Sequence, residues 1–180
     1  MLMSPIEPAA VTFEEAIALT QSMLSQIEAG KLSPTETATA LAALVKSENG
    51  ARGFFVTYLT DSRSLADNPS SAVVQALRCA PEIVAELLVK NLAMSAAMAV
   101  THRRNQNEAM ANQSERVQLR TMRLIELVDI PYVQELSQRL WDSVTGGEGS
   151  YKAFLERWGY DAEQLQVIQQ ALVPVIKVQD

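Results

Sequence analysis

The fold of this chain is decided by residues 82–130, which read EIVAELLVKNLAMSAAMAVTHRRNQNEAMANQSERVQLRTMRLIELVDI. The stretch runs for 49 residues without glycine or proline and is rich in residues that lose little on entering a helix, such as alanine, leucine, glutamine and arginine. Pro81 stands at its front, where the missing N–H costs nothing, and Pro131 closes it. The stretch therefore predicts one long helical element over about residues 81–129.

The middle of this element is strongly polar and predicts a break. Between two apolar lines, residues 101–114 carry five amide side chains. An unbroken helix would be roughly 70 Å long, whereas a compact domain of this size spans about 40 Å. We therefore expect the helix to break near residues 105–114, with the motif Asn112–Glu115 capping its second part. The alternative is a continuous helix whose projecting half pairs with a second subunit.

The N-terminal part predicts shorter helices. The capping-box patterns Thr12–Glu15 and Ser33–Glu36 each start a helix, and the short connection between them predicts an antiparallel hairpin over residues 12–49. Gly53–Thr60 is the one segment with a local preference for β structure. A lone strand would leave its backbone groups unpaired, so we expect this segment to be helical, with Phe55 and Val56 buried.

The C-terminal part predicts a cluster of short helices over residues 131–173. Helix starts are expected at Pro131, Ser150 and Asp161, and glycines follow the first two helices. Residues 1–11 and 174–180 are expected to be loose ends. The chain is thus predicted to be a single all-α domain of residues 1–180, a multi-helix bundle with a hairpin at 12–49, central helices at 50–130 and the cluster at 131–173.

Composition indicates a globular chain, with 48% hydrophobic and 20% charged residues. The net charge of −6 argues against nucleic-acid or anionic-membrane partners, which attract positive surfaces. The most apolar window, residues 83–100, contains Glu86 and Lys90, so we interpret it as a buried helix and not a membrane span. The single cysteine, Cys79, and the absence of a signal-peptide pattern predict a cytoplasmic protein.

Catalytic patterns are absent from the sequence. His102 is the only histidine, which excludes zinc sites with two histidines and the paired Glu-x-x-His motifs of di-iron bundles. No nucleophile elbow or phosphate-binding loop is present. Cys79 is better interpreted as a packing residue, and Asp61 and Asp67 as turn residues. We therefore predict no enzyme activity, no metal and no cofactor.

Two basic groups within the long stretch are candidate partner-binding residues. Arg116, Arg120 and Arg123 fall on one helix face, and His102, Arg103 and Arg104 lie close together before the expected break. If the three-arginine stripe is exposed, it suits the carboxylates of an acidic protein partner. The alternative is that these arginines are solvated or pair with acidic residues of the same chain.

The function predicted from these patterns is that of a non-enzymatic protein-protein interaction or scaffold protein. We also expect a homo-oligomer, a dimer, because an exposed apolar line at Val117, Leu124 and Val128 would favour a partner helix. The alternative function is a helical bundle that binds a small apolar or anionic ligand between its helices. The side chains expected to line such a pocket are Met94, Met98, Trp141 and Trp158.

Overall fold

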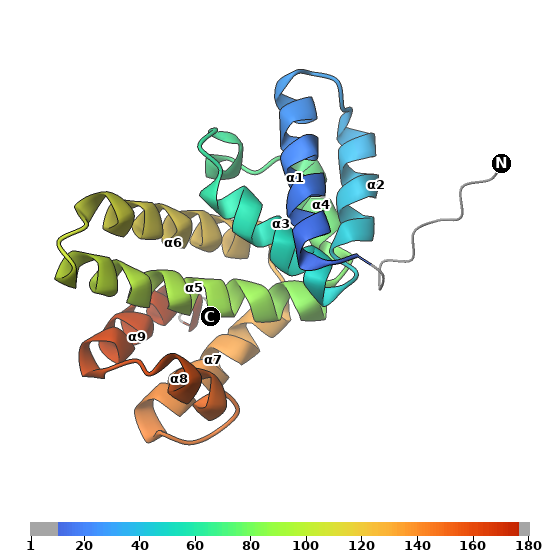
Figure 1. The fold of residues 1–180 in the computed structure, drawn as a ribbon. Coiled ribbons are helices and arrows are strands. Elements are labelled where there is room, and N and C mark those ends of the chain that lie inside the picture. Colours follow the sequence, from blue (N-terminus) through green and yellow to red (C-terminus); the bar gives the residue numbers. More distant parts are fainter. Residues whose placement is uncertain (1–10, 177–180) are drawn as a thin grey trace. The chain divides into compact units, whose positions relative to one another are not determined.

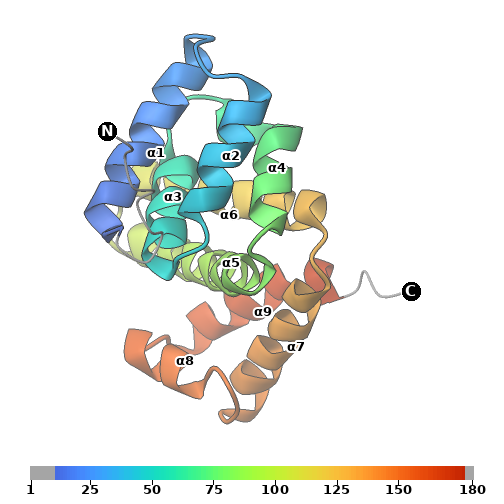
Figure 2. The same ribbon diagram turned by 90° about the vertical axis from the view of Figure 1, so that its right-hand side faces the viewer.

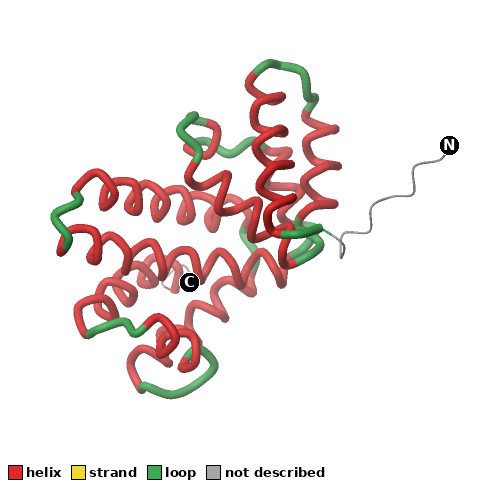
Figure 3. The backbone as a smooth tube through the Cα atoms, in the orientation of Figure 1, coloured by secondary structure: helices red, strands yellow, loops and turns green. Residues whose placement is uncertain are grey.

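The computed structural model describes residues 11–176, and over that range all of its regular structure is helical (Figure 3). The helices, labelled in Figure 1, are α1 Phe13–Glu28, α2 Pro34–Leu44, α3 Glu48–Thr60, α4 Ser71–Arg78, α5 Pro81–Arg104, α6 Glu108–Val128, α7 Pro131–Gly146, α8 Lys152–Trp158 and α9 Ala162–Ile176, with a short 3-10 turn at Leu65–Asp67. The predicted all-α fold is confirmed.

The chain forms two compact units that divide within α5, between Leu87 and Leu88. The first unit contains α1 to α4 and the start of α5. The second contains the rest of α5 and the helices α6 to α9. That residues 1–180 act as a single domain stays a prediction.

The first unit begins with the predicted pair of capped helices. Thr12 and Glu15 cap α1 reciprocally, since each backbone N–H donates to the other's side chain at 3.0 and 3.1 Å. Ser33 and Glu36 do the same for α2. In Figures 1 and 2, α1 and α2 lie side by side, and α2 also packs against α4.

The second of these helices ends earlier than predicted. It stops at Leu44, and α3 begins at Glu48, because the Ser47 hydroxyl accepts the Gly50 N–H at 3.1 Å and caps the new helix. The predicted end of the hairpin's second helix at residue 49 is therefore wrong. Gly50 permits this tight junction, since a Cβ there would lie 1.9 Å from the Leu44 carbonyl oxygen.

Residues 53–60 form the main part of α3, as predicted, and not a strand. Phe55 is buried, but Val56 is 44% exposed, so the prediction of burial is wrong for Val56. The reason is helical periodicity: the buried face of α3 belongs to Phe54, Phe55, Tyr58 and Leu59. The Phe54 and Tyr58 rings stack on that face with centroids 4.9 Å apart.

The 49-residue stretch breaks, as predicted, but earlier than the predicted cap. Helix α5 ends at Arg104 and α6 begins at Glu108. Gln106 adopts a left-handed backbone conformation (φ 57°), and the Asn107 side chain accepts the Met110 N–H at 3.2 Å. The cap is therefore Asn107 and not Asn112, because the left-handed residue stops the first helix immediately before it. Figure 1 shows α6 returning beside α5.

With the helix broken, most of the apolar line on α6 is buried. Leu124 and Val128 are fully buried and Val117 is half-buried. The apolar line that was expected to be exposed, and to favour a dimer, is thus mostly buried. Self-association stays a prediction, without that argument for it.

The C-terminal cluster follows the prediction up to its last turn. Gly147 and Gly159 end α7 and α8 with left-handed backbones (φ 70° and 61°), and α7 packs against α9 (Figure 2). Helix α9 continues through Pro174 to Ile176, so the loose end predicted from residue 174 is wrong for 174–176. Proline has a helical φ and costs α9 one hydrogen bond near its end, while Val175 is buried. The expected loose ends at 1–10 and 177–180 lie outside the described residues.

Among the described residues, α5 is the one helix whose length and composition would allow it to cross a membrane. In its most apolar window, 56% is buried within the protein. Core helices of soluble proteins share this length and composition, so the property does not by itself assign a membrane location.

We predict that Gly53→Ala destabilises the protein. Helices α1 and α3 pack closely at this glycine, and a Cβ there would lie 2.4 Å from the Ala16 Cβ and 3.0 Å from the Phe13 carbonyl oxygen. Overpacking of this kind costs about 1–3 kcal/mol, and urea unfolding would measure it. The double variant Ala16→Gly/Gly53→Ala should recover part of the loss.

The control for this prediction is Gly146→Ala, where nothing lies within 4 Å of the added Cβ. It should leave the free energy of unfolding nearly unchanged. Equal stability of the Gly53→Ala variant and the wild type would show that the two helices separate without cost.

Candidate functional site

The largest of the pockets described here is a groove of about 610 Å³ between α1 and α3 in the first unit. We call it the α1–α3 groove. Its lining residues are Ile17, Gln21, Leu24 and Ser25 from α1, Val56, Thr57 and Thr60 from α3, and Asp61, Ser62 and Arg63 from the following loop.

The floor of the α1–α3 groove is apolar. Ile17 and Leu24 recur at helical spacing on α1, and Val56 faces them from α3. The nearby threonine hydroxyls are occupied within α3, since Thr57 donates to the Gly53 carbonyl at 2.8 Å and Thr60 donates to the Val56 carbonyl. The groove therefore offers hydrocarbon contact at Ile17, Leu24 and Val56, flanked by polar side chains such as Gln21 and Ser62.

One end of the α1–α3 groove is closed by a charged cluster. The Arg63 guanidinium pairs with Glu28, lies 3.0 Å from Asp61 Oδ2, and donates to the Ser25 hydroxyl at 3.1 Å. These hydrogen bonds, the one to Glu28 first, raise the pKa of Arg63. Two carboxylates share one guanidinium, so this end of the groove has a net negative charge.

The whole first unit is acidic. Residues 1–87 contain ten acidic and five basic side chains, so they carry −5 of the chain's net charge of −6. The other basic side chain near the groove, Arg52, lies over the Phe13 ring at 5.2 Å from its centroid. A positively charged group approaching the groove would therefore be attracted.

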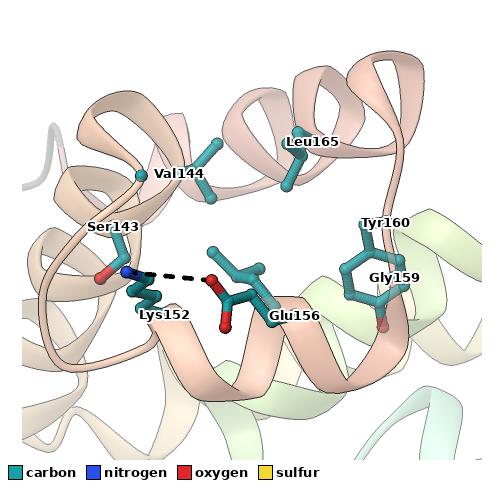
Figure 4. Close-up of a pocket in the computed structure, with 9 residues that line it drawn as sticks. Ser143, Val144, Lys152, Glu156, Gly159, Tyr160 and Leu165 are labelled. Carbon is teal, nitrogen blue, oxygen red and sulfur yellow. Dashed lines mark ion pairs between the residues drawn. The ribbon is translucent and has the colours of Figure 1, made fainter.

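A second pocket, of about 390 Å³, lies between α7, α8 and α9 in the second unit (Figure 4). Val144, Leu155 and Leu165 line it with hydrocarbon, and Lys152 and Glu156 point toward one another along α8 with Nζ and Oε1 4.0 Å apart. Lys152 also binds Glu148 at 3.0 Å. The pocket's two opposite charges thus largely neutralise each other.

The remaining polar groups of this second pocket have structural roles. The Ser143 hydroxyl donates to the Arg139 carbonyl at 3.0 Å and accepts the Tyr151 N–H at 3.1 Å, so it anchors the start of α8. Burial raises the pKa of Tyr160 to about 12. The phenol is therefore protonated at neutral pH.

A third pocket, of about 300 Å³, lies where the turn between α6 and α7 meets the end of α9. We call it the α6–α7–α9 pocket. It is lined by Met122, Ile125, Glu126, Asp129, Ile130, Pro131, Val133, Gln134, Pro174 and Val175. Its walls are apolar and its charged lining residues are both acidic.

The basic residues before the helix break are engaged in ion pairs of the second unit. Arg103 lies 2.6 Å from Glu115 and 3.4 Å from Glu108, which ties α5 to α6. Arg104 binds Asp161 and Glu163 at the start of α9. These partners raise the pKa of both arginines. His102, predicted with them, is half-buried on the last turn of α5.

The three-arginine stripe is not uniformly exposed. Arg116 and Arg123 are exposed, but Arg120 is only 2% exposed, and Arg123 lies 3.4 Å from Glu126. Arg120 lies four residues before Leu124 and therefore belongs to the buried face of α6. The condition on which the acidic-partner hypothesis rested, exposure of all three side chains, is not met at Arg120.

The predicted pocket residues do not converge on any one of the pockets described above. Met94 and Trp141 are half-buried, whereas Met98 and Trp158 are 37% and 49% exposed. Trp141 lines a small cavity of about 140 Å³ with Gln138, Val173 and Ile176. The two methionines lie on α5.

The sequence patterns did not predict the α1–α3 groove or the α6–α7–α9 pocket. Each is formed by residues from helices far apart in the chain, which local periodicity does not bring together. One signal was present for each: Gly53 within a helix, which marks a close helix contact, and Pro174, which interrupts α9. Within residues 11–176, no group of three or more histidine, cysteine, aspartate or glutamate side chains is arranged to hold a metal ion.

Comparison with known proteins identifies the family. A family model described as "Uncharacterised conserved protein UCP020893" matches residues 12–175, and the chain belongs to this family. No curated protein and no solved structure matches the chain.

We predict that replacing Arg120 by glutamate lowers the free energy of unfolding much more than replacing Arg123 does. Arg120→Glu places a carboxylate at a buried position and should cost about 3–5 kcal/mol, as when a buried charge loses its partner. Arg123→Glu should cost less than about 1 kcal/mol, because its pair with Glu126 is exposed. Urea unfolding of the two variants would measure this. Similar small costs would mean that solvent reaches the Arg120 guanidinium.

We also predict a pH-dependent contribution from Asp161. The hydrogen bond from Arg104 lowers the pKa of Asp161 to about 2, below the usual value of about 3.9. A lowered pKa adds stability above the usual value, and that stability is lost as the pH falls from about 4 to about 2. Asp161→Ser keeps a residue that caps α9 but removes the charge.

The measurement is the melting temperature of both proteins between pH 6 and pH 2 by circular dichroism. The wild type should melt higher at pH 6, and the difference should shrink toward pH 2. Asp142→Asn removes an exposed carboxylate that bonds to Gln138 and serves as the control. A difference between wild type and Asp161→Ser that does not change with pH would contradict the assignment.

Proposed function

We propose that this member of the UCP020893 family is a non-enzymatic binding protein whose α1–α3 groove holds a basic, amphipathic helix of a partner protein. The observation that carries the proposal is Val56, a branched apolar side chain that is 44% exposed within the groove. Such helices bind grooves by burying an apolar face.

The lining of the groove supports a helical occupant. Apolar side chains from α1 and α3 face the same space, and hydroxyls of Thr57 and Thr60 are bonded within α3. A helix docked there would cover Ile17 and Val56, and the Thr57 and Thr60 hydroxyls would keep their hydrogen bonds within α3. Burial of apolar area supplies most of the free energy in such a complex.

The charge of the unit supports a basic occupant. The arginines on α5 and α6 had suggested an acidic partner, but Arg103 and Arg104 are held by carboxylates of the second unit and Arg120 is buried. The carboxylates of Glu28 and Asp61 lie at the groove's end, in a unit of net charge −5. Complementary charge would speed association and orient the partner.

A binding role also agrees with the chemistry of the other polar groups. The Ser143 hydroxyl of α7 is bonded to the Arg139 carbonyl and the Tyr151 N–H, and Lys152 is shared between Glu148 and Glu156. Such groups hold structure and are poor candidates for nucleophile or base. Cys79 is a free, exposed thiol and not the packing residue expected from the sequence, and a free thiol supports a reducing compartment such as the cytoplasm as the place of action.

We predict that Val56→Lys abolishes binding of a basic amphipathic peptide. The probe is a fluorescein-labelled synthetic helix with leucine on one face and lysine on the other, and fluorescence anisotropy measures its affinity. The new lysine adds a positive charge and blocks the groove floor, so the Kd should rise about tenfold or more. Higher salt should weaken binding to the wild type.

The matched control is Leu19→Lys, which changes an apolar residue of α1 that is 53% exposed but does not line the groove. This variant should bind the peptide like the wild type. A helix with glutamate in place of lysine should bind more weakly than the basic one. Equal losses in the two protein variants, or no binding to the wild type, would refute the proposal.

A further inference from the structure

We infer that the α6–α7–α9 pocket of the second unit is a separate binding site for a small amine that carries a short hydrocarbon chain. This site is independent of the α1–α3 groove, because its lining residues all belong to the second unit. Its apolar walls, acidic lip and small volume together define the ligand.

The walls of the pocket are set by the turn between α6 and α7. Asp129 adopts a left-handed backbone (φ 47°, ψ 52°) and its N–H donates to the Ile125 carbonyl at 3.3 Å, which ends α6. Ile130 is extended, and Pro131 begins α7 one residue later. This two-residue turn presents Ile130 and Val133 beside Ile125, and Val175 of α9 completes an apolar wall.

The lip of the pocket is acidic. The Asp129 carboxylate has no protein partner within the described part of the chain, and Glu126 has only a long contact of 3.4 Å with Arg123. These are acceptors, and an ammonium group carries three donors and one positive charge.

The size of the pocket limits the hydrocarbon chain. Its 300 Å³ lies at the lower end of the range for small-molecule sites and corresponds to about ten water molecules. An amine with about six carbons would fill it, with its chain against Ile125, Val133 and Val175 and its ammonium group at Asp129. A carboxylate ligand would meet like charge at the lip. The site therefore favours a cationic ligand over the anionic one considered from the sequence.

The test is an NMR titration of the ¹⁵N-labelled full-length protein with n-hexylamine, n-hexanol and hexanoate at neutral pH. Hexylamine should shift the amide signals of the pocket, those of Asp129, Ile130 and Val175 among them, and should bind more tightly than the other two. In Asp129→Asn the hexylamine Kd should rise about threefold or more, the effect of one exposed charge. Asparagine tolerates the left-handed backbone, so the turn is kept.

Asp142→Asn is the control, since Asp142 is an exposed carboxylate of α7 that does not line the pocket. This variant should bind hexylamine like the wild type. Three results would each overturn the inference: no binding of hexylamine, equal binding of hexanol and hexylamine, or equal losses in the two variants. Because no α1–α3 groove residue is changed, failure here leaves the peptide experiment unaffected.

Discussion

The second unit depends on the turn at Asn105–Asn107, where 49 residues of strong helix formers are divided into α5 and α6. Local preference alone would continue the helix, since the stretch holds no glycine or proline. Gln106 instead takes a left-handed conformation, which is uncommon for a residue with a Cβ, and Asn107 caps the new helix. The break is stabilised by the interactions that it makes available: Leu124 and Val128 are buried, and Arg103 of α5 reaches Glu115 of α6.

Polar contacts fix α9 against the same helix. Gln164 is 8% exposed and donates to the Thr101 hydroxyl at 2.9 Å and to the Ala97 carbonyl at 3.4 Å. Arg104 holds Asp161 and Glu163 one turn further along α5. The residues that looked most available for a partner, His102 to Arg104, are thus adjacent to or part of the internal framework of this unit. Binding surfaces must be sought elsewhere, and the pockets with unneutralised charge are the α1–α3 groove and the α6–α7–α9 pocket.

The sequence predicted the elements well, because helix starts and stops are local. The caps at Thr12, Ser33 and Asp161 and the glycines after α7 and α8 all act as predicted. Errors arose where several local signals competed or where tertiary contacts decided. Asn112 and Asn107 were both competent caps, and the left-handed Gln106 selected the earlier one. Val56 and Arg120 each lie on the face of a helix opposite to the one assigned, a distinction set by which neighbours pack against it.

The binding sites could not be read from the sequence for a related reason. A pocket between helices is formed by residues such as Ile17 and Val56, or Ile125 and Val175, which are 39 and 50 positions apart. Their proximity follows from packing at Gly53 and from the two-residue turn before Pro131. The net charge of a region can be counted from the sequence, and the N-terminal part is acidic. Which arginines are neutralised follows only from the ion pairs, such as those of Arg103 and Arg104.

The most direct test of this account is the distance between spin labels on residues 98 and 123, measured by double electron–electron resonance in a Cys79→Ser background. Met98 and Arg123 are exposed side chains on α5 and α6. Helix α6 turns back beside α5 and the Arg103–Glu115 ion pair joins the two, so the distribution should be centred below about 25 Å. A continuous helix would place these positions about 37 Å apart, and a distribution centred there would contradict the break on which the second unit depends.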